Sequence, residues 1–154
     1  TVYGILARII NGVPAGTNEF PSLGILRRTG DIRGRPGICG ASVINSQWLL
    51  TTAHCCTASR TGVAIDPADV SFELGTNFDS TCDARPSKSG ACFYSGTKPQ
   101  PGTIVQTLEV YPHEEYNGIS RPAKNDICLL KVSPFDIDNI KIKPVILPVY
   151  GYII

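Results

Sequence analysis

The stretch that decides the fold is Trp48–Cys55, WLLTTAHC, in which an apolar run leads directly into a histidine and ends on a cysteine. A second apolar run, Ile127–Val132, begins directly after Asp126. A histidine oriented by an aspartate is the base half of a nucleophilic triad, in which the imidazole takes up the proton of the attacking group. His54 and Asp126 are therefore the candidate catalytic pair.

The attacking serine of such a triad has no recognisable setting in this sequence. No serine lies in a Gly-x-Ser-x-Gly segment, the nucleophile elbow of another hydrolase class. Ser42 follows Cys39-Gly40-Ala41 in an expected strand, where packing is a better interpretation than attack. His113 lies among polar residues in an expected loop, and we expect no catalytic role for it.

Length and charge bound the class of protein. The 154 residues suffice for one domain with a real core. Lysine and arginine number 14 against 13 acidic residues, and there is no basic run, so we expect neither nucleic acid nor a membrane as partner. No apolar run reaches the roughly 18 residues of a membrane-spanning helix.

The six cysteines indicate an oxidising compartment, and hence a secreted, extracellular protein. Cys55 and Cys56 are adjacent and the other cysteines lie far apart, which is no zinc spacing. A disulfide framework is favoured over a metal site, while the arithmetic of six cysteines leaves the pairing open.

Short apolar runs separated by turn formers predict an all-β fold. The expected strands are Phe20–Arg27, Ile38–Ile44, Trp48–Ala53, Val70–Leu74, Thr103–Val110 and Ile127–Val132. The second and third form a hairpin, and the Gly- and Pro-rich residues 76–102 form a long surface excursion. Six short strands without a helical period indicate a small closed barrel.

Four motifs, in order along the chain, carry a family resemblance. They are Arg8–Gly12 (RIING), Cys39–Ser42 (CGAS) with Trp48–Cys55, Asn125–Leu130 (NDICLL) and Lys143–Pro148 (KPVILP). In these the chain resembles the amino-terminal half of a trypsin-like (chymotrypsin-fold) serine protease. The resemblance covers about Arg8 to Pro148, nearly the whole sequence.

The resemblance implies a fold and a domain organisation. It implies a Greek-key six-stranded barrel, the first of the two barrels of that fold. Residues 1–8 would be the end of a propeptide, 9–148 the amino-terminal barrel and 149–154 a truncated linker between barrels. The bond between Arg8 and Ile9 would be the activation cleavage site.

The resemblance also implies residue roles. His54 would be the general base and Asp126 would hold its tautomer. We expect the disulfides Cys39–Cys55, Cys56–Cys128 and Cys82–Cys92. The first follows the family. The second is inferred because the catalytic pair must meet, which brings its chain neighbours within disulfide reach, and the third closes a polar loop locally.

The implied function is a serine-type endopeptidase that acts on protein or peptide substrates and meets protease inhibitors, with no cofactor and no metal. The family's Gly-Asp-Ser-Gly-Gly segment is not in the sequence, so we expect this chain alone to be inactive and truncated. The alternative is a non-catalytic protease homologue that binds a partner. A third interpretation is a truncated gene product without a stable fold.

Some members of the family carry a calcium-binding loop, and four carboxylates of this chain are candidate ligands for such a loop. They are Glu73, Asp79, Glu114 and Glu115. Their spacing does not suit calcium, and we expect them to be solvated.

Overall fold

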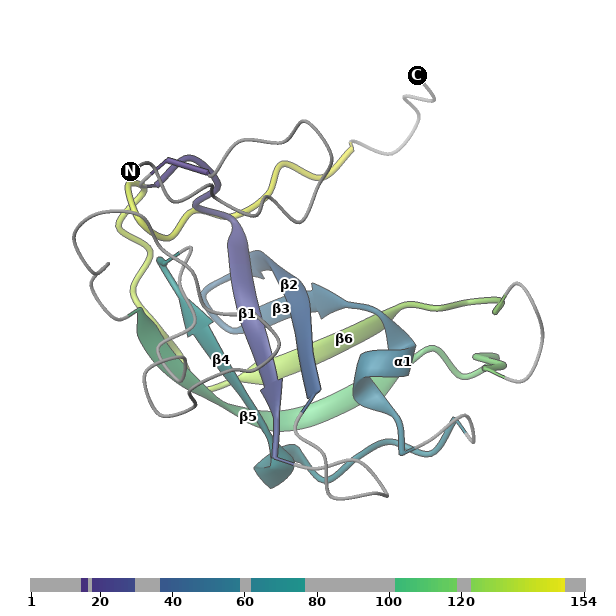
Figure 1. Ribbon diagram of the computed structural model, residues 1–154. Helices are drawn as coiled ribbons and strands as arrows, with labels where there is room; N and C mark the ends of the chain where they lie inside the picture. The colour runs from purple at the N-terminus through teal and green to yellow at the C-terminus, as the bar shows by residue number, and fades with distance from the viewer. Residues whose placement is uncertain are drawn as a thin grey trace, which may run out of the picture.

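Six antiparallel strands form one closed barrel in the computed structural model, which describes residues 15–16, 18–29, 37–58, 62–76, 102–118 and 123–148 (Figure 1). The strands are β1 (Leu23–Arg28), β2 (Gly37–Asn45), β3 (Trp48–Thr51), β4 (Val70–Leu74), β5 (Thr103–Pro112) and β6 (Cys128–Val132). Two single helical turns accompany them, α1 (Ala53–Cys56) and η1 (Pro67–Asp69). The predicted all-β barrel is confirmed.

The strand order around the barrel is β1-β2-β3-β6-β5-β4. The first three strands pair in sequence, and β4 then returns to the free edge of β1, which is the Greek-key arrangement. The pairing of β3 with β6 closes the barrel, with Thr51 opposite Cys128. This closure brings the end of β3 beside the start of β6, where the histidine and aspartate motifs lie.

The expected strands agree with the structure except at their ends. β4 has the expected bounds, and β5 continues two residues further, to Pro112. β3 was expected to reach Ala53 but ends at Thr51, because Thr52 is the N-cap of α1 and Ala53 begins the helical turn. Sequence periodicity missed α1, since four residues are too few to show a helical repeat. No described helix is long and apolar enough to cross a membrane.

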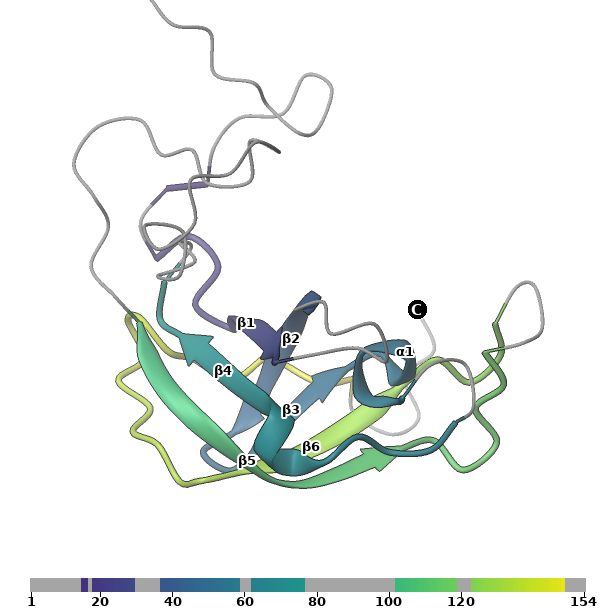
Figure 2. The ribbon, with the colours of Figure 1, turned by 60° about the horizontal axis from the view of Figure 1, so that its bottom comes forward.

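Alternation along the strands builds the core. The buried side chains that point inward come from alternate positions, namely Val70, Phe72 and Leu74 on β4 and Leu130 and Val132 on β6. The cysteines of α1 and the first residue of β6 belong to the same cluster. The helical turn is therefore packed onto the end of the barrel, and Figure 2 shows it beside the end of β3 and the start of β6.

Among the three described carboxylates of the calcium-loop candidates, Glu73 is the one whose expected environment is wrong. Its side chain is fully buried on β4 rather than solvated. It forms an ion pair with Arg27 of β1 and accepts a hydrogen bond from the Gly102 amide at 2.9 Å. A buried charge is tolerated when it is paired and hydrogen-bonded, which explains how Glu73 sits in a strand interior. Glu114 and Glu115 are exposed as expected, and Asp79 lies outside the described residues.

Candidate active site

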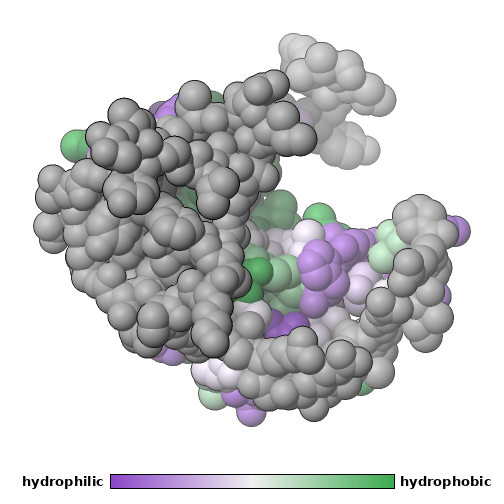
Figure 3. Space-filling view, in the orientation of Figure 1, coloured by the Kyte–Doolittle hydropathy of each residue, from purple (hydrophilic) through white to green (hydrophobic). Residues whose placement is uncertain are grey.

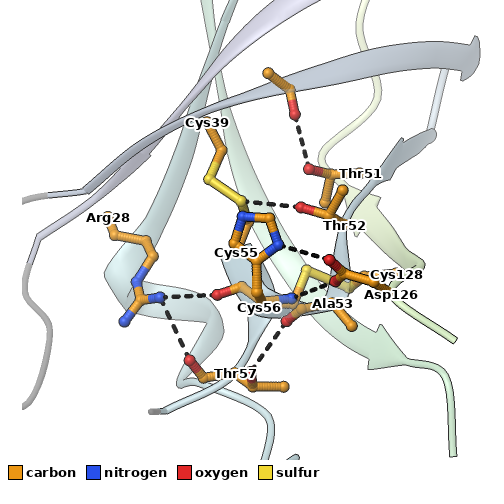
Figure 4. Close-up of a disulfide and its surroundings, with 12 residues drawn as sticks. Arg28, Cys39, Thr51, Thr52, Ala53, Cys55, Cys56, Thr57, Asp126 and Cys128 are labelled. Carbon is orange, nitrogen blue, oxygen red and sulfur yellow. Dashed lines mark hydrogen bonds and ion pairs between the residues drawn. A yellow bond between two sulfur atoms is a disulfide. The ribbon is translucent and has the colours of Figure 1, made fainter. Parts of the chain in front are cut away.

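His54 is the second residue of α1, and its side chain is 59% exposed. Its ring Nδ1 lies 2.8 Å from Oδ2 of Asp126, and the Asp126 side chain is 30% exposed. Figure 4 shows Asp126 beside Cys128. Asp126 sits in the segment that leads into β6, so β3–α1 supplies the imidazole and the start of β6 supplies the carboxylate. The structure therefore brings together two residues 72 positions apart in the sequence.

The other oxygen of the same carboxylate holds the backbone of the histidine. Oδ1 of Asp126 accepts a hydrogen bond from the His54 amide at 2.9 Å. A carboxylate accepts only, so the imidazole donates from Nδ1 and its Nε2 is left as the acceptor. A general base needs this tautomer, because the unprotonated Nε2 can accept a proton.

The bonds from α1 also affect the charge of Asp126. Partial burial is the largest single influence and would raise the pKa of the carboxyl group. The hydrogen bonds from the ring and amide of His54 are the main influences that together outweigh burial and lower the pKa below its usual value. Asp126 is therefore ionised wherever an ordinary aspartate is.

Two disulfides fasten α1 on either side. Cys55 is bonded to Cys39 of β2 and Cys56 to Cys128 of β6, with Cα atoms 6.4 and 6.6 Å apart. Both separations lie within the range that disulfides ordinarily span. The two residues that follow His54 are thus covalently linked to two different strands of the barrel, β2 and β6. The second bridge also reaches a residue two positions beyond Asp126.

Arg28 is a neighbour of the site that sequence reasoning missed. Its guanidinium Nη1 donates to the carbonyl oxygens of His54 and Thr57, at 3.5 and 3.3 Å (Figure 4). These carbonyls belong to α1 and to its C-cap Thr57, and a single helical turn leaves such acceptors unsatisfied. The sequence carries no signal for this contact, because Arg28 lies 26 positions before His54 and belongs to no motif.

One group of described residues has the composition of a metal site. Potential ligand atoms of Cys39, His54 and Cys55 lie within 4.8 Å of one another. The two sulfur atoms are bonded to each other in the disulfide, so neither is the thiolate that a metal would bind. The group does not fit a metal ion in this oxidised state.

The remaining candidates lie apart from the pair or outside the described residues. Ser42 is half-buried in β2, and His113 is exposed in the turn after β5, where its Nδ1 accepts from the Glu115 amide at 3.1 Å. Outside the described residues lie Arg8, Ile9, Cys82, Cys92 and residues 149–154. Figure 3 shows that the described surface visible in this orientation carries hydrophilic residues beside hydrophobic ones.

Comparison with known proteins identifies the relatives of this chain. The family model described as Trypsin matches residues 9–84. Melanization protease 1 of Drosophila melanogaster is 32% identical over 149 residues, covering 92% of this chain and 33% of that protein. CLIP domain-containing serine protease B14 of Anopheles gambiae is 29% identical over 150 residues, or 97% of this chain and 38% of that protein. The chain spans well under two thirds of the length of these relatives.

The closed barrel, the match to the Trypsin family model over residues 9–84 and the relatives named as serine proteases all agree. They support similarity of this chain to part of a trypsin-like serine protease.

Proposed function

We propose that the protein is a serine endopeptidase and that this chain supplies the base half of its catalytic site. His54 is the general base and Asp126 is the residue that orients it. The observation that carries the proposal is the double contact of one carboxylate, with Oδ2 on the imidazole Nδ1 at 2.8 Å and Oδ1 on the His54 amide at 2.9 Å. A capping aspartate without a catalytic role would not need to hold the ring and the backbone of one histidine.

The chemistry follows from the free Nε2 of the imidazole. A serine hydroxyl attacks the carbonyl carbon of the peptide bond and gives its proton to Nε2. The imidazolium, stabilised by Asp126, returns this proton to the leaving amine, which leaves an acyl-enzyme. Water then attacks the acyl-enzyme with His54 again as base, and the carboxylic acid product and the serine are released.

This assignment leaves the nucleophile and the oxyanion donors outside the 154 residues of the sequence. One oxyanion donor contributes about 3–4 kcal/mol to the transition state, and covalent catalysis needs the serine itself. We therefore propose that these 154 residues alone do not turn over substrate. In the same way we propose residues 9–148 as the barrel domain, residues 149–154 as a linker, and the Arg8–Ile9 bond as the point of activation after a propeptide.

The proposed substrates are proteins and peptides, with protease inhibitors as further partners. The proposed location is extracellular, because the bridges Cys39–Cys55 and Cys56–Cys128 persist only in an oxidising compartment. Two relatives are named as proteases, Melanization protease 1 of Drosophila melanogaster and Venom serine protease 34 of Apis mellifera.

The test compares the protein translated from the complete transcript with the 154-residue chain. Both are oxidised, treated briefly with trypsin to cut at Arg8–Ile9, freed of trypsin and exposed to a fluorophosphonate probe. We expect the complete protein to be labelled and to cleave peptide reporter substrates, and the 154-residue chain to do neither. A complete protein that is not labelled would establish the non-catalytic homologue instead. Labelling of a serine within the 154 residues would overturn the assignment of the nucleophile.

A further inference from the structure

The residue before Asp126 has an uncommon backbone conformation. Asn125 has a φ of 55°, in the left-handed region. For a residue with a Cβ atom this conformation costs roughly 1–2 kcal/mol of conformational free energy, and asparagine is among the few residues that adopt it routinely. The chain therefore turns sharply just before the catalytic aspartate.

The side chain of Asn125 is fastened to the neighbouring segment. Its Nδ2 donates to the carbonyl oxygen of Glu115 at 3.1 Å. Glu115 lies in the turn that follows β5, beyond the last β5–β6 pair. On the far side of this contact, Asn117 and Lys124 form an isolated antiparallel bridge. The side-chain amide thus joins the two segments at a point where the backbone conformation of Asn125 interrupts their ladder.

The backbone around Asp126 completes the turn. The Ile127 amide donates to the Asn125 carbonyl at 2.8 Å, which closes a three-residue turn with Asp126 at its centre. The His113 amide then donates to the Ile127 carbonyl at 2.9 Å and restores the contact with the β5 segment. The residues on both sides of Asp126 are therefore bound to the β5 side of the sheet. The carboxylate of Asp126 reaches His54 of α1.

We propose that Asn125 is a positioning residue for the catalytic pair: its left-handed backbone and its amide bond to Glu115 fix the turn that presents both carboxylate oxygens of Asp126 to His54. The inference rests on the proposed function, because it assigns a role within the same site. Asn125 acts through the backbone on either side of Asp126 and is therefore a positioning residue.

Asparagine is the residue that meets both demands of this position. Glycine would accept the positive φ but could not bond to the Glu115 carbonyl. Aspartate would accept the conformation, but as a carboxylate it has no donor for that carbonyl and would place a second negative charge beside Asp126. Alanine would lose the bond and disfavour the conformation.

The test uses nuclear magnetic resonance on the oxidised 154-residue chain, so that it needs no turnover. The variants are Asn125→Gly, which keeps the backbone and removes the bond, and Asn125→Ala, which removes both. In Asn125→Gly we expect the pKa of the Asp126 carboxyl group to rise toward its usual value and the His54 Nδ1 proton to exchange faster with water. In Asn125→Ala both changes are larger.

The matched control is Asn139, which has a φ of 58° and is exposed on the segment after β6. Asn139→Gly and Asn139→Ala are expected to leave both signals unchanged. If Asn125→Gly leaves the Asp126 pKa and the His54 proton as in the original chain, the proposal is wrong. If the Asn139 variants move the same signals, the effect is a general loosening and the proposal is also wrong.

In the complete protein, Asn125→Gly is expected to lower kcat by about 10-fold to 10²-fold with little change in KM, as a small misplacement of a catalytic group does. An unchanged kcat alongside shifted resonances would contradict a role in positioning. A complete protein that is inactive from the outset overturns the proposed function instead, and the resonance experiment still reports on Asn125.

Discussion

At the scale of single residues, the Asp126 carboxylate has two tasks. One oxygen sets the tautomer of the His54 ring and the other holds the amide of the same residue. The same carboxylate therefore holds both the ring and the backbone of His54. Asp126 is in this way a part of the local structure of α1, in addition to the orienting role that we propose for it.

The depressed pKa of Asp126 leads to a prediction about acid stability. A carboxyl group whose pKa is lower in the folded state stabilises the fold fully at pH values above its unfolded pKa. That contribution is lost as the pH falls through the unfolded and then the folded pKa. Asp126→Asn should therefore destabilise the chain by about 1 kcal/mol near pH 7, because the bonds are charge-assisted but partly exposed, and by less in acid.

The measurement is urea unfolding of the chain and of Asp126→Asn at a series of pH values from about 7 down to 2. The two stability curves should converge on acidification. Curves that run parallel across the whole range would show that the ionised Asp126 is not favoured by folding.

The family resemblance of the sequence predicted that His54 and Asp126 meet, and the structure shows the two side chains in contact, while their catalytic roles stay a prediction. The sequence did not predict the contacts that support them. The contact of Arg28 with α1 and the left-handed backbone of Asn125 depend on where separate segments happen to pass. No local pattern of residue types encodes such contacts, and only the structure shows them.

At the scale of elements, α1 is a single turn that is stable only through its attachments. Four residues are far too few for an independent helix in water. Its buried cysteines, the Thr57 hydroxyl bonded to the Ala53 carbonyl at 3.0 Å, and Arg28 hold it in place. Sequence periodicity could predict the strands, which alternate over several residues, but it could not predict a turn of this kind.

The two bridges of α1 should differ in what they contribute to stability. Cys56–Cys128 spans 72 positions and Cys39–Cys55 spans 16. On the chain-entropy estimate they stabilise the fold by about 4 and 3 kcal/mol, because the longer loop restricts the unfolded chain more. The double variant Cys56→Ala/Cys128→Ala should therefore lose more stability than Cys39→Ala/Cys55→Ala in denaturant unfolding.

The pairing itself is checked by peptide mapping without reduction. A map in which Cys56 is joined to Cys82 or Cys92 would refute it.

Two buried threonines offer a matched test of the barrel strands. The Thr107 hydroxyl on β5 is buried and, among the described residues, has no hydrogen-bond partner. The Thr51 hydroxyl on β3 is similarly buried but donates to the Gly40 carbonyl at 2.7 Å. Thr107→Val should stabilise the chain by about 1 kcal/mol, since it removes an unsatisfied polar group.

Thr51→Val serves as the comparison, because it makes the same change where a bond is lost. It should destabilise the chain by about 1 kcal/mol in the same unfolding experiment. Effects of equal sign in the two variants would contradict the hydrogen bonding of these strands as described.

At the scale of the whole molecule, the barrel places the histidine and the aspartate at one end, where β3 and β6 meet. Closure of the barrel determines this meeting, and the Greek-key order determines that the two motifs come from distant parts of the sequence. The imidazole side chain stays more than half exposed there, as the proposed general base requires. Under the proposed function, this end of the barrel forms one wall of the catalytic site.

The most direct test of this account is a comparison of the two histidines of the sequence in the complete protein. His54→Ala and His113→Ala are each assayed for kcat/KM on a peptide reporter substrate. Loss of the general base should lower kcat/KM by at least about 10⁴-fold, the scale seen when a member of such a triad is removed, while His113→Ala retains the original value. A His54→Ala protein that keeps the activity of the original would contradict the catalytic role of the His54–Asp126 pair.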